Sequence, residues 1–373
     1  MLIYLIIFFS SFFLFIIAEK ERKKNNKKIY IIITFIAILI PSVLAGLRDY
    51  SIGTDVKVYG NIWFDNAVQY VKKNDMMSYI TWAKNSNMGI FYALLNYIVA
   101  NFTNNTHVFY FVLSYLTTVL IYKAVRDNDD CIDVPLAMMA YYLLFFNQSL
   151  NVLRQSLALA FVLCSFKSIR DNKTKKFIIW ILLATATHET GCIAILLYIV
   201  YKALNSKIRL LSKIGIIVLT IFFVIGFSYL SKILINVGVL SSKYEIYANN
   251  YQRGGAYVRL LLLCLPNVFL QFIFANRKKI SEESIAFRYY VIISTIISFL
   301  AFKMTYITRI AMYFDILLVF SIPYACNVTK YKVVFGKVKY NKLLIIGYLV
   351  VYWIYVYGII KSGETVPYQV FTV

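Results

Sequence analysis

The chain has 373 residues, of which 61% are hydrophobic, and it carries a formal net charge of +22. An ordinary soluble domain is about 45–50% apolar, so this composition excludes an ordinary soluble fold. The two histidines and five scattered cysteines argue against a metal site and a disulfide framework, and we expect no cofactor.

The basic residues lie in short clusters between apolar runs, as in the cytoplasmic loops of membrane proteins. We therefore expect contacts with membrane lipid and none with nucleic acid. We predict an all-α fold, a polytopic transmembrane helical bundle of about 11–13 membrane helices that include short or re-entrant ones. No linker divides the chain, so we predict a single integral membrane domain over residues 1–373.

Apolar runs long enough to cross a bilayer begin at residue 2. The run 2–18 precedes the basic stretch "EKERKKNNKK", the reverse of the order in a cleavable signal, so we predict an uncleaved helix with its N-terminus outside. The helix 29–47 then leads to an external loop, 48–87. Further helices are expected at 107–124, 134–150, 152–167, 177–200, 211–230, 257–275, 285–301, 307–326 and 343–360.

This topology places most of the 39 lysines and arginines in inside loops, as the positive-inside rule requires. The apolar segment 89–102 has about 14 residues, or roughly 21 Å of helix, and is too short for a span of about 30 Å. We predict that it is re-entrant or interfacial and is entered from outside. A second external loop, 231–256, is rich in tyrosine and basic residues, which fits either sugar binding or an interfacial belt.

The stretch "NVLRQSLALAFVLCSF" (151–166) places Arg154 and Gln155 at the head of an apolar helix. A charge below the lipid surface is costly, so Arg154 should face a water-filled cavity on the outer side. Asn147 and Asn151 follow spacings of three and four residues, which would place all four side chains on one helix face. The alternative is that Arg154 snorkels to the headgroups.

The stretch "ATATHETGCI" places His188 midway along the run 177–200. Neither half of this run spans a bilayer alone, so a broken helical hairpin with His188 and Glu189 near its apex is predicted. Non-helical backbone at that depth is tolerated against protein or a wet cavity. The alternative is one continuous tilted helix of about 25 residues.

A third polar group lies in "FKMTYITRIAMYFD" (302–315), where Arg309 and Tyr313 are four residues apart and can share a helix face. Asp315 lies off that face and is expected to pair with another buried group.

The loop "GLRDYSIGTDVKVYG" (46–60) supplies a fourth group. Gly53-Thr54-Asp55 has the composition of a turn, and Arg48 stands at the membrane boundary.

Several arginines facing one outer cavity suit a lipid diphosphate, because guanidinium groups bind phosphate oxygens bidentately and stay charged. Fixed cations also stabilise the charge that grows on such a leaving group. A hydroxyl acceptor needs a base, for which His188 is favoured and Asp55 is the rival. No P-loop and no outer carboxylate cluster for Mg²⁺ appears, so we predict metal-independent glycosyl transfer.

The order of these motifs resembles the EpsG/Wzy-type polysaccharide polymerase family. The resemblance covers nearly the whole chain and rests on "RDYSIGTDVKVY", "NVLRQSLALAF", "ATATHETGCIAIL", "TYITRIAMYF" and "VPYQVF" (366–371). It implies a multi-pass enzyme of the bacterial inner membrane whose active site faces the periplasm or outside. Such an enzyme transfers a growing glycan from undecaprenyl diphosphate to a sugar hydroxyl of the next lipid-linked repeat unit, as in O-antigen synthesis. A chain-length regulator is a further implied partner.

The resemblance matches Arg48 and Asp55 to the loop signature, Arg154 and Gln155 to an Arg-Gln signature, His188 to a histidine signature and Arg309 to a late Arg-Tyr signature. We predict that Arg154 and Arg309 bind the diphosphate and that Arg48 or Arg259 assists. The expected supporting residues are Gln155, Asn151 and Tyr313. One departure is "NSNMGIFYALL" (85–95), where the family pattern leads us to expect an acidic residue before the glycine.

A flippase or other transporter of lipid-linked oligosaccharide is the alternative from another class, since it also needs cations in a cavity. Transporters often contain internal repeats, and none is evident here. An O-antigen ligase, with the same donor, and a membrane acyltransferase, with one histidine in a helical bundle, are further alternatives.

Overall fold

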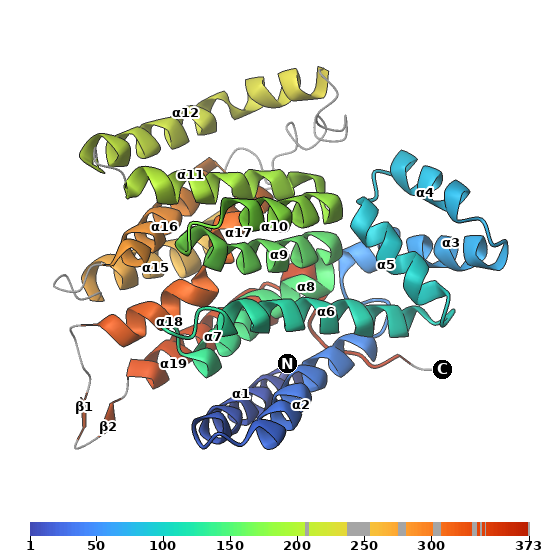
Figure 1. Ribbon diagram of the computed structural model, residues 1–373, viewed down its shortest axis with the longest axis horizontal. Coiled ribbons are helices and arrows are strands. Elements are labelled where there is room, and N and C mark those ends of the chain that lie inside the picture. The colour runs from blue at the N-terminus through green and yellow to red at the C-terminus, as the bar shows by residue number, and fades with distance from the viewer. Residues whose placement is uncertain are drawn as a thin grey trace. The chain divides into compact units, whose positions relative to one another are not determined.

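The computed structural model describes residues 1–205, 209–236, 254–274, 281–300, 307–329, 334–335, 338–339 and 341–371 (Figure 1). The described chain is almost entirely helical, which confirms the predicted all-α polytopic bundle. One short antiparallel hairpin interrupts the helices, with strand β1 (Val334–Phe335) paired to β2 (Val338–Lys339).

The contacts group the chain into two compact units. Unit 1 comprises Met1–Cys192 and Val334–Val373, and unit 2 comprises Ile193–Val333. The structure defines each unit by itself, so the assignment of one domain to residues 1–373 stays a prediction.

Four helices in the described chain are long and apolar enough to cross a membrane: Leu2–Lys23, Lys27–Gly46, Thr106–Arg126 and Asn341–Ile359. A fifth candidate is the bent pair Ile307–Asp315 and Leu318–Val328. The protein is therefore a multi-pass membrane protein. The prediction of 11–13 membrane helices also counted broken and short segments. A criterion based on helix length does not test these segments, so that number stays a prediction.

In unit 1, helices α1 (Leu2–Lys23) and α2 (Lys27–Gly46) form a hairpin, the dark blue pair in Figure 1. The turn between them uses Asn25 in the left-handed conformation (φ 60°), which asparagine tolerates. Helix α6 (Thr106–Arg126) packs against α2 and against α9 (Leu153–Arg170). Nearly every side chain of α9 is buried, so this helix forms the core of unit 1.

The remaining helices of unit 1 are short. The α-helices are α3 (Asn61–Lys72), α4 (Met76–Asn85), α5 (Ile90–Ala100), α7 (Val134–Tyr141), α8 (Asn147–Asn151), α10 (Thr174–Thr187) and α19 (Asn341–Trp353). The π-helical stretches are Val56–Gly60, Tyr142–Phe146 and Ile354–Ile359, and the 3₁₀ turns are Glu189–Ala194, whose last two residues belong to unit 2, and Ser362–Glu364.

Two predictions for unit 1 concern the segment between α2 and α6. The predicted external loop 48–87 contains the helices α3 and α4. Helix α5 has 11 residues, or about 16 Å, which is shorter than a bilayer crossing. That length agrees with the prediction of a re-entrant or interfacial segment at 89–102, which stays a prediction.

In unit 2, helix α16 (Glu282–Leu300) is central, because it contacts each of the other α-helices described in this unit. The other helical segments are α11 (Ile195–Leu204), α12 (Arg209–Asn236), α14 (Gly254–Arg259), α15 (Leu265–Phe269), α17 (Ile307–Asp315) and α18 (Leu318–Val328), with π-helical stretches at Leu260–Cys264 and Leu270–Phe274.

Two predictions for unit 2 need correction. The expected single helix 307–326 bends by 43° between α17 and α18. There the backbone hydrogen bonds tighten to i→i+3, as in the bond from the N–H of Val319 to the carbonyl of Ile316. The expected external loop 231–256 begins as helix, because α12 extends to Asn236, and α14 begins at Gly254. Residues 237–253, with Lys243, Tyr244, Tyr247, Tyr251 and Arg253, lie outside the described residues.

Candidate functional site

The loop that follows α2 is held by the C-terminal segment of the chain. Arg48 and Val370 form an isolated antiparallel bridge, and the N–H of Phe371 donates to the carbonyl of Leu47 at 3.1 Å. The hydroxyl of Tyr368 donates to the carbonyl of Leu44 at 2.7 Å. The first and last sequence motifs therefore form one structural element.

The turn Gly53-Thr54-Asp55, predicted from composition, is built against α8. Gly53 has a φ of +92°, and a Cβ at this position would lie 2.4 Å from the carbonyl oxygen of Leu150. The side chain of Asn151 then accepts hydrogen bonds at Oδ1 from the N–H of Thr54 (2.8 Å), the hydroxyl of Thr54 (2.6 Å) and the N–H of Asp55 (3.3 Å). Asn151 thereby positions the loop that carries Asp55.

Arg154 lies in the first turn of α9, directly after a break in the helix. The break is at Val152, which has a ψ of 71°. The guanidinium carbon of Arg154 lies 5.0 Å from the ring centre of Tyr59 and 4.6 Å from that of Trp63. No carboxylate in the described part of the chain forms an ion pair with it, so aromatic faces and a backbone carbonyl hold this cation.

Asp55, Tyr59 and Trp63 follow one another at intervals of four residues along the π-helical stretch Val56–Gly60 and α3. The rings of Tyr59 and Trp63 are 4.4 Å apart, and the hydroxyl of Tyr59 donates to Oδ2 of Asp55. Burial, and then the neighbouring Asp55 carboxylate, raise the pKa of Tyr59. The phenol therefore stays protonated. Its hydroxyl binds the carboxylate of Asp55 while its ring lies against the guanidinium of Arg154.

The carbonyl that holds Arg154 comes from the turn between α4 and α5. Asn87 has a φ of 51°, a left-handed conformation that commonly ends a helix, and its carbonyl accepts from Nη1 of Arg154 at 2.9 Å. Two residues later, a Cβ on Gly89 would lie 2.3 Å from the carbonyl oxygen of Thr187. The glycine therefore lets this turn contact the end of α10, where His188 follows.

The predicted break at His188 is confirmed. Helix α10 ends at Thr187, His188 is extended (φ −147°, ψ 126°), and a 3₁₀ turn follows. The chain folds back here, because a Cβ on Gly191 would lie 2.6 Å from the carbonyl carbon of Ala184. The histidine is 5% exposed, so the turn buries it.

The imidazole of His188 is oriented by Thr190. Its Nδ1 lies 2.8 Å from the hydroxyl of Thr190 and also receives the backbone N–H of Thr190 at 3.4 Å. A backbone N–H can only donate, so this contact makes Nδ1 an acceptor and favours the tautomer that carries hydrogen on Nε2.

A cavity of about 420 Å³ adjoins these groups within unit 1. Its polar lining comes from Lys84, Asn87, Thr185 and Glu189, and Gly89 also faces it. The cavity is bordered by the backbone that receives Arg154 and by the residue that follows His188. Lys84 is exposed and has no ion-pair partner in the described chain, so the cavity has an available cation of its own.

Arg48 is placed differently from Arg154. It is 1% exposed, its guanidinium carbon lies 4.5 Å from the ring centre of Tyr110, and its Nε and Nη2 have no hydrogen-bond partner in the described chain. Burial lowers the pKa of Arg48. Its side chain is enclosed by protein and is not open to a ligand in this structure.

The expectation that Asn147, Asn151, Arg154 and Gln155 share one helix face is wrong, because the helix breaks at Val152 between the two pairs. Asn147 instead donates to Oγ1 of Thr365 at 3.0 Å and accepts from the indole of Trp353 at 2.7 Å. Gln155 is buried within the unit.

The remaining predicted site residues belong to unit 2. Arg259 forms an ion pair with Asp315 and donates to the hydroxyls of Ser298 at 2.9 Å and Ser294 at 3.3 Å. The prediction that Asp315 pairs with another buried group is thus confirmed. Asp315 would compete with a phosphate for the N–H groups of Arg259.

Arg309 and Tyr313 both lie on α17, four residues apart, with Arg309 half-buried and Tyr313 fully buried. Their predicted proximity on one helix is confirmed. Their relation to Arg154 and His188 stays a prediction, because the structure defines each unit by itself.

Within the described residues, no group of three or more histidine, cysteine, aspartate or glutamate side chains is placed to hold a metal ion.

The comparison with known families decides the affiliation. The EpsG family model matches residues 31–370. The chain belongs to the EpsG family. No curated protein and no solved structure matches the chain.

Membership of the EpsG family supports a polysaccharide polymerase-type function carried out by a glycosyltransferase-like membrane protein. The match begins within α2 and ends at Val370, so it includes every site residue named above.

Sequence reasoning missed three groups of this EpsG-family site: the aromatic pair Tyr59 and Trp63, the carbonyl of Asn87, and Lys84. The spacing of four between Asp55, Tyr59 and Trp63 was a usable signal, because it places the three on one side of a helix. Asn87 and Lys84 gave no local signal. The role of Asn87 depends on its contact with Arg154, 67 residues away, and Lys84 is singled out only by its place in the cavity lining.

Proposed function

We propose that this EpsG-family protein is an inner-membrane polysaccharide polymerase that uses an undecaprenyl diphosphate-linked glycan as donor. The observation that supports the proposal is Arg154, a guanidinium that lies against two aromatic rings and donates to the carbonyl of Asn87, a residue that lines the cavity. No carboxylate of the described residues is ion-paired to it. An uncompensated cation in that position favours an anionic ligand, and diphosphate oxygens match its N–H groups.

In the proposed reaction, a hydroxyl of the acceptor sugar attacks the anomeric carbon of the donor glycan. A new glycosidic C–O bond forms, the bond between the anomeric carbon and the phosphate oxygen breaks, and the electron pair leaves with undecaprenyl diphosphate. The hydroxyl proton passes to a base. Negative charge grows on the departing diphosphate, and Arg154 and Lys84 stabilise it.

The contacts of His188 support a choice between the two candidate bases. Nδ1 lies within hydrogen-bond distance of the hydroxyl and the backbone N–H of Thr190, which favours hydrogen on Nε2. We therefore give Asp55 the role of base and His188 the role of a hydrogen-bond donor to the diphosphate or the sugar. The sequence alone favoured His188 as the base, with Asp55 as the rival candidate. Arg309 remains a proposed second diphosphate ligand, supported by Tyr313.

The other predicted residues have lesser roles in this proposal. Asn151 and Gln155 position the loop and the first turn of α9. Arg48 holds the loop to the C-terminal segment, and Arg259 binds Asp315. The active site is proposed to face the periplasm, since the basic loops take the cytoplasmic side.

The test uses purified protein in proteoliposomes with a lipid-linked repeat unit, read as a glycan ladder. Arg154→Ala should lower turnover about 10²–10³-fold, the usual effect of removing one donor to developing charge. Lys167→Ala is the matched control, because it removes a charge from the other end of α9. Equal activity in both variants would contradict the role of Arg154. Translocation of the lipid-linked unit without elongation would instead indicate a transporter.

A second pair of variants tests the base. Asp55→Asn should lower turnover about 10²–10⁴-fold, the usual contribution of a general base. His188→Gln keeps an N–H donor near the position of Nε2 and should retain activity within about tenfold of wild type, less than the loss of one charge-stabilising donor. The opposite order of sensitivity would return the base role to His188.

A further inference from the structure

A second cavity of unit 1, of about 430 Å³, lies where α1 ends and α19 begins. It is lined by α1, by the N-terminal turn of α7 and by the start of α19. Both α1 and α19 pack against α7, so α7 forms the floor between them. The lining is apolar toward one side and charged toward the other, which is the arrangement of an amphiphile site.

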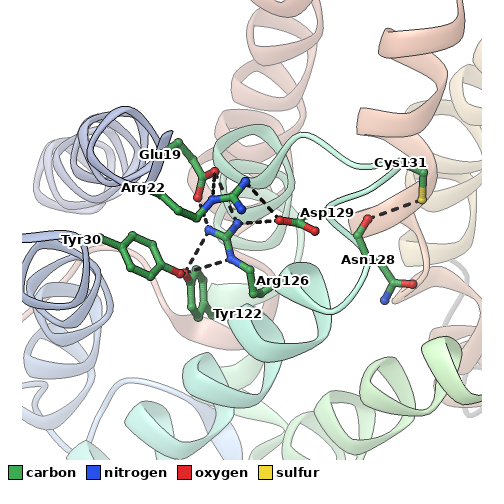
Figure 2. Close-up of polar contacts among 8 residues, drawn as sticks. All are labelled: Glu19, Arg22, Tyr30, Tyr122, Arg126, Asn128, Asp129 and Cys131. Atoms are coloured by element: carbon green, nitrogen blue, oxygen red, sulfur yellow. Dashed lines mark hydrogen bonds and ion pairs between the residues drawn. The ribbon is translucent and has the colours of Figure 1, made fainter. Parts of the chain in front are cut away.

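The acidic side chains of this cavity are already compensated. Figure 2 shows Arg126 between Glu19 and Asp129, with Arg22 beside the same two carboxylates. Nη1 of Arg126 lies 2.9 Å from Oδ2 of Asp129, and Nε of Arg22 lies 3.0 Å from Oε2 of Glu19.

The third acid, Asp133, caps α7 by accepting the N–H of Leu136 at 3.1 Å and forms an ion pair with Lys342. All three carboxylates are therefore bound by groups of the protein.

Two lysines at the cavity have no such partner. Lys20 and Lys23 line it, both are exposed, and neither forms an ion pair with any described residue. They stand three residues apart on the last turns of α1, so their ammonium groups lie on the same side of the helix. The cavity therefore carries a local positive surplus at one end.

The other end of the cavity is apolar. Phe12 and Ile16 of α1 and Ile346 of α19 line it, over the floor that Val134 and Pro135 begin. Next to this lining, Phe13 is 57% exposed and Leu343 is 62% exposed. In a membrane-spanning helix such side chains face acyl chains, so the apolar end of the cavity opens toward lipid.

We propose that this cavity binds an anionic phospholipid, with the headgroup phosphate on Lys20 and Lys23 and an acyl chain along Phe12, Ile16 and Ile346. Basic pockets between membrane helices on the cytoplasmic side are suited to acidic headgroups, and the positive-inside rule assigns this end to that leaflet. Charge complementarity selects the anionic headgroup, and the apolar walls select a lipid over a free phosphate. The proposal is independent of the proposed function.

Native mass spectrometry of the full chain tests it, with phosphatidylglycerol as the probe and phosphatidylcholine as the neutral comparison. Lys20→Gln with Lys23→Gln should weaken phosphatidylglycerol binding about fivefold per lysine, or roughly 30-fold for the pair. The matched control is Lys27→Gln with Lys28→Gln, which removes two exposed lysines from the start of α2, outside the cavity. The control should leave binding unchanged.

Equal weakening in both double variants would overturn the proposal, because it would show diffuse attraction to a basic surface. Equal retention of the two lipids by the wild-type chain would also overturn it.

A second measurement does not depend on the lysine variants. A photoreactive benzoyl-phenylalanine at Phe12, in protein held in native membranes, should crosslink to phospholipid and give a lipid mass increment. Crosslinking to a polypeptide at this position would overturn the proposal and identify the cavity as a protein interface. The same group at Phe35, an exposed position on α2, gives the background level of lipid crosslinking.

Discussion

Arg154 and Arg126 of unit 1 both lie against a pair of aromatic rings, but they have different electrostatic partners. Each lies near a helix end against two aromatic rings, Tyr59 and Trp63 for Arg154, and a tyrosine pair for Arg126 at 5.5 and 5.6 Å. Arg126 is also ion-paired with two carboxylates, whereas no described carboxylate pairs with Arg154.

The difference separates two uses of the same side chain. The carboxylates of Glu19 and Asp129 neutralise Arg126 and join α1 to α6, so that this arginine stabilises the bundle. Arg154 has a fixed position with no carboxylate ion-paired to it among the described residues, because aromatic faces orient a guanidinium while leaving its N–H groups available. An arginine that is ordered but uncompensated suits an anionic ligand, and the predictions below test whether stability and activity divide along this line.

The largest expected effect on stability is that of Arg126→Gln. It leaves the partly buried carboxylates of Glu19 and Asp129 with Arg22 as the cation that still pairs with both, so the free energy of unfolding should fall by up to about 3 kcal/mol. Thermal melting in detergent measures the loss, and turnover per folded molecule should stay unchanged. Lys123→Gln on the same helix, whose pair with Asp127 is more exposed, should cost less than about 1 kcal/mol. Similar losses from both would remove the distinction.

A smaller loss is expected from Asn151→Ala, which removes the acceptor for three hydrogen bonds of Thr54 and Asp55. Donors left unsatisfied typically cost about 1–3 kcal/mol. Because Asp55 is carried by this loop, turnover should fall together with thermal stability. Asn101→Ala, an exposed asparagine, is the control and should change neither. A stable but inactive Asn151→Ala protein would indicate direct contact with substrate.

The smallest effect on activity is expected when one of the two aromatic rings beside each arginine is removed. Trp63→Leu deprives Arg154 of one of its two aromatic faces, worth about 0.5–2 kcal/mol, so KM for the lipid-linked donor should rise about 3- to 30-fold with little change in kcat. Tyr122→Leu removes a ring from Arg126 and should leave KM unchanged, since carboxylates still hold that arginine. A KM effect in both variants would show that the rings act through the fold.

The positions of the long apolar helices could be predicted, because apolar run length and the basic clusters indicate where a span begins and ends. The short helices α3 and α4 lie in a segment predicted as a loop. The break at His188 was also predictable, since neither half of its run spans a bilayer. The pairing of Asp315 followed from the cost of an isolated buried charge, although Arg259 was assigned elsewhere.

The detailed site could not be predicted, because its contacts join residues far apart in the chain. The break at Val152 has no glycine or proline beside it, and it accompanies the turn of Asn151 toward Thr54, 97 residues away. The same holds for the hydrogen bond between Arg154 and Asn87, which joins residues 67 positions apart. A single sequence contains no signal for such pairs, and an isolated asparagine looks the same in a helix face or a loop.

The bridge between Arg48 and Val370 affects how the protein is made. Loop 48–55 emerges from the ribosome early, yet its pairing strand is synthesised more than 300 residues later. The loop that carries Asp55 therefore acquires this support only after residues 366–371 have been synthesised. A nascent chain that has not reached those residues lacks the support, so the bridge makes maturation of the site conditional on their synthesis.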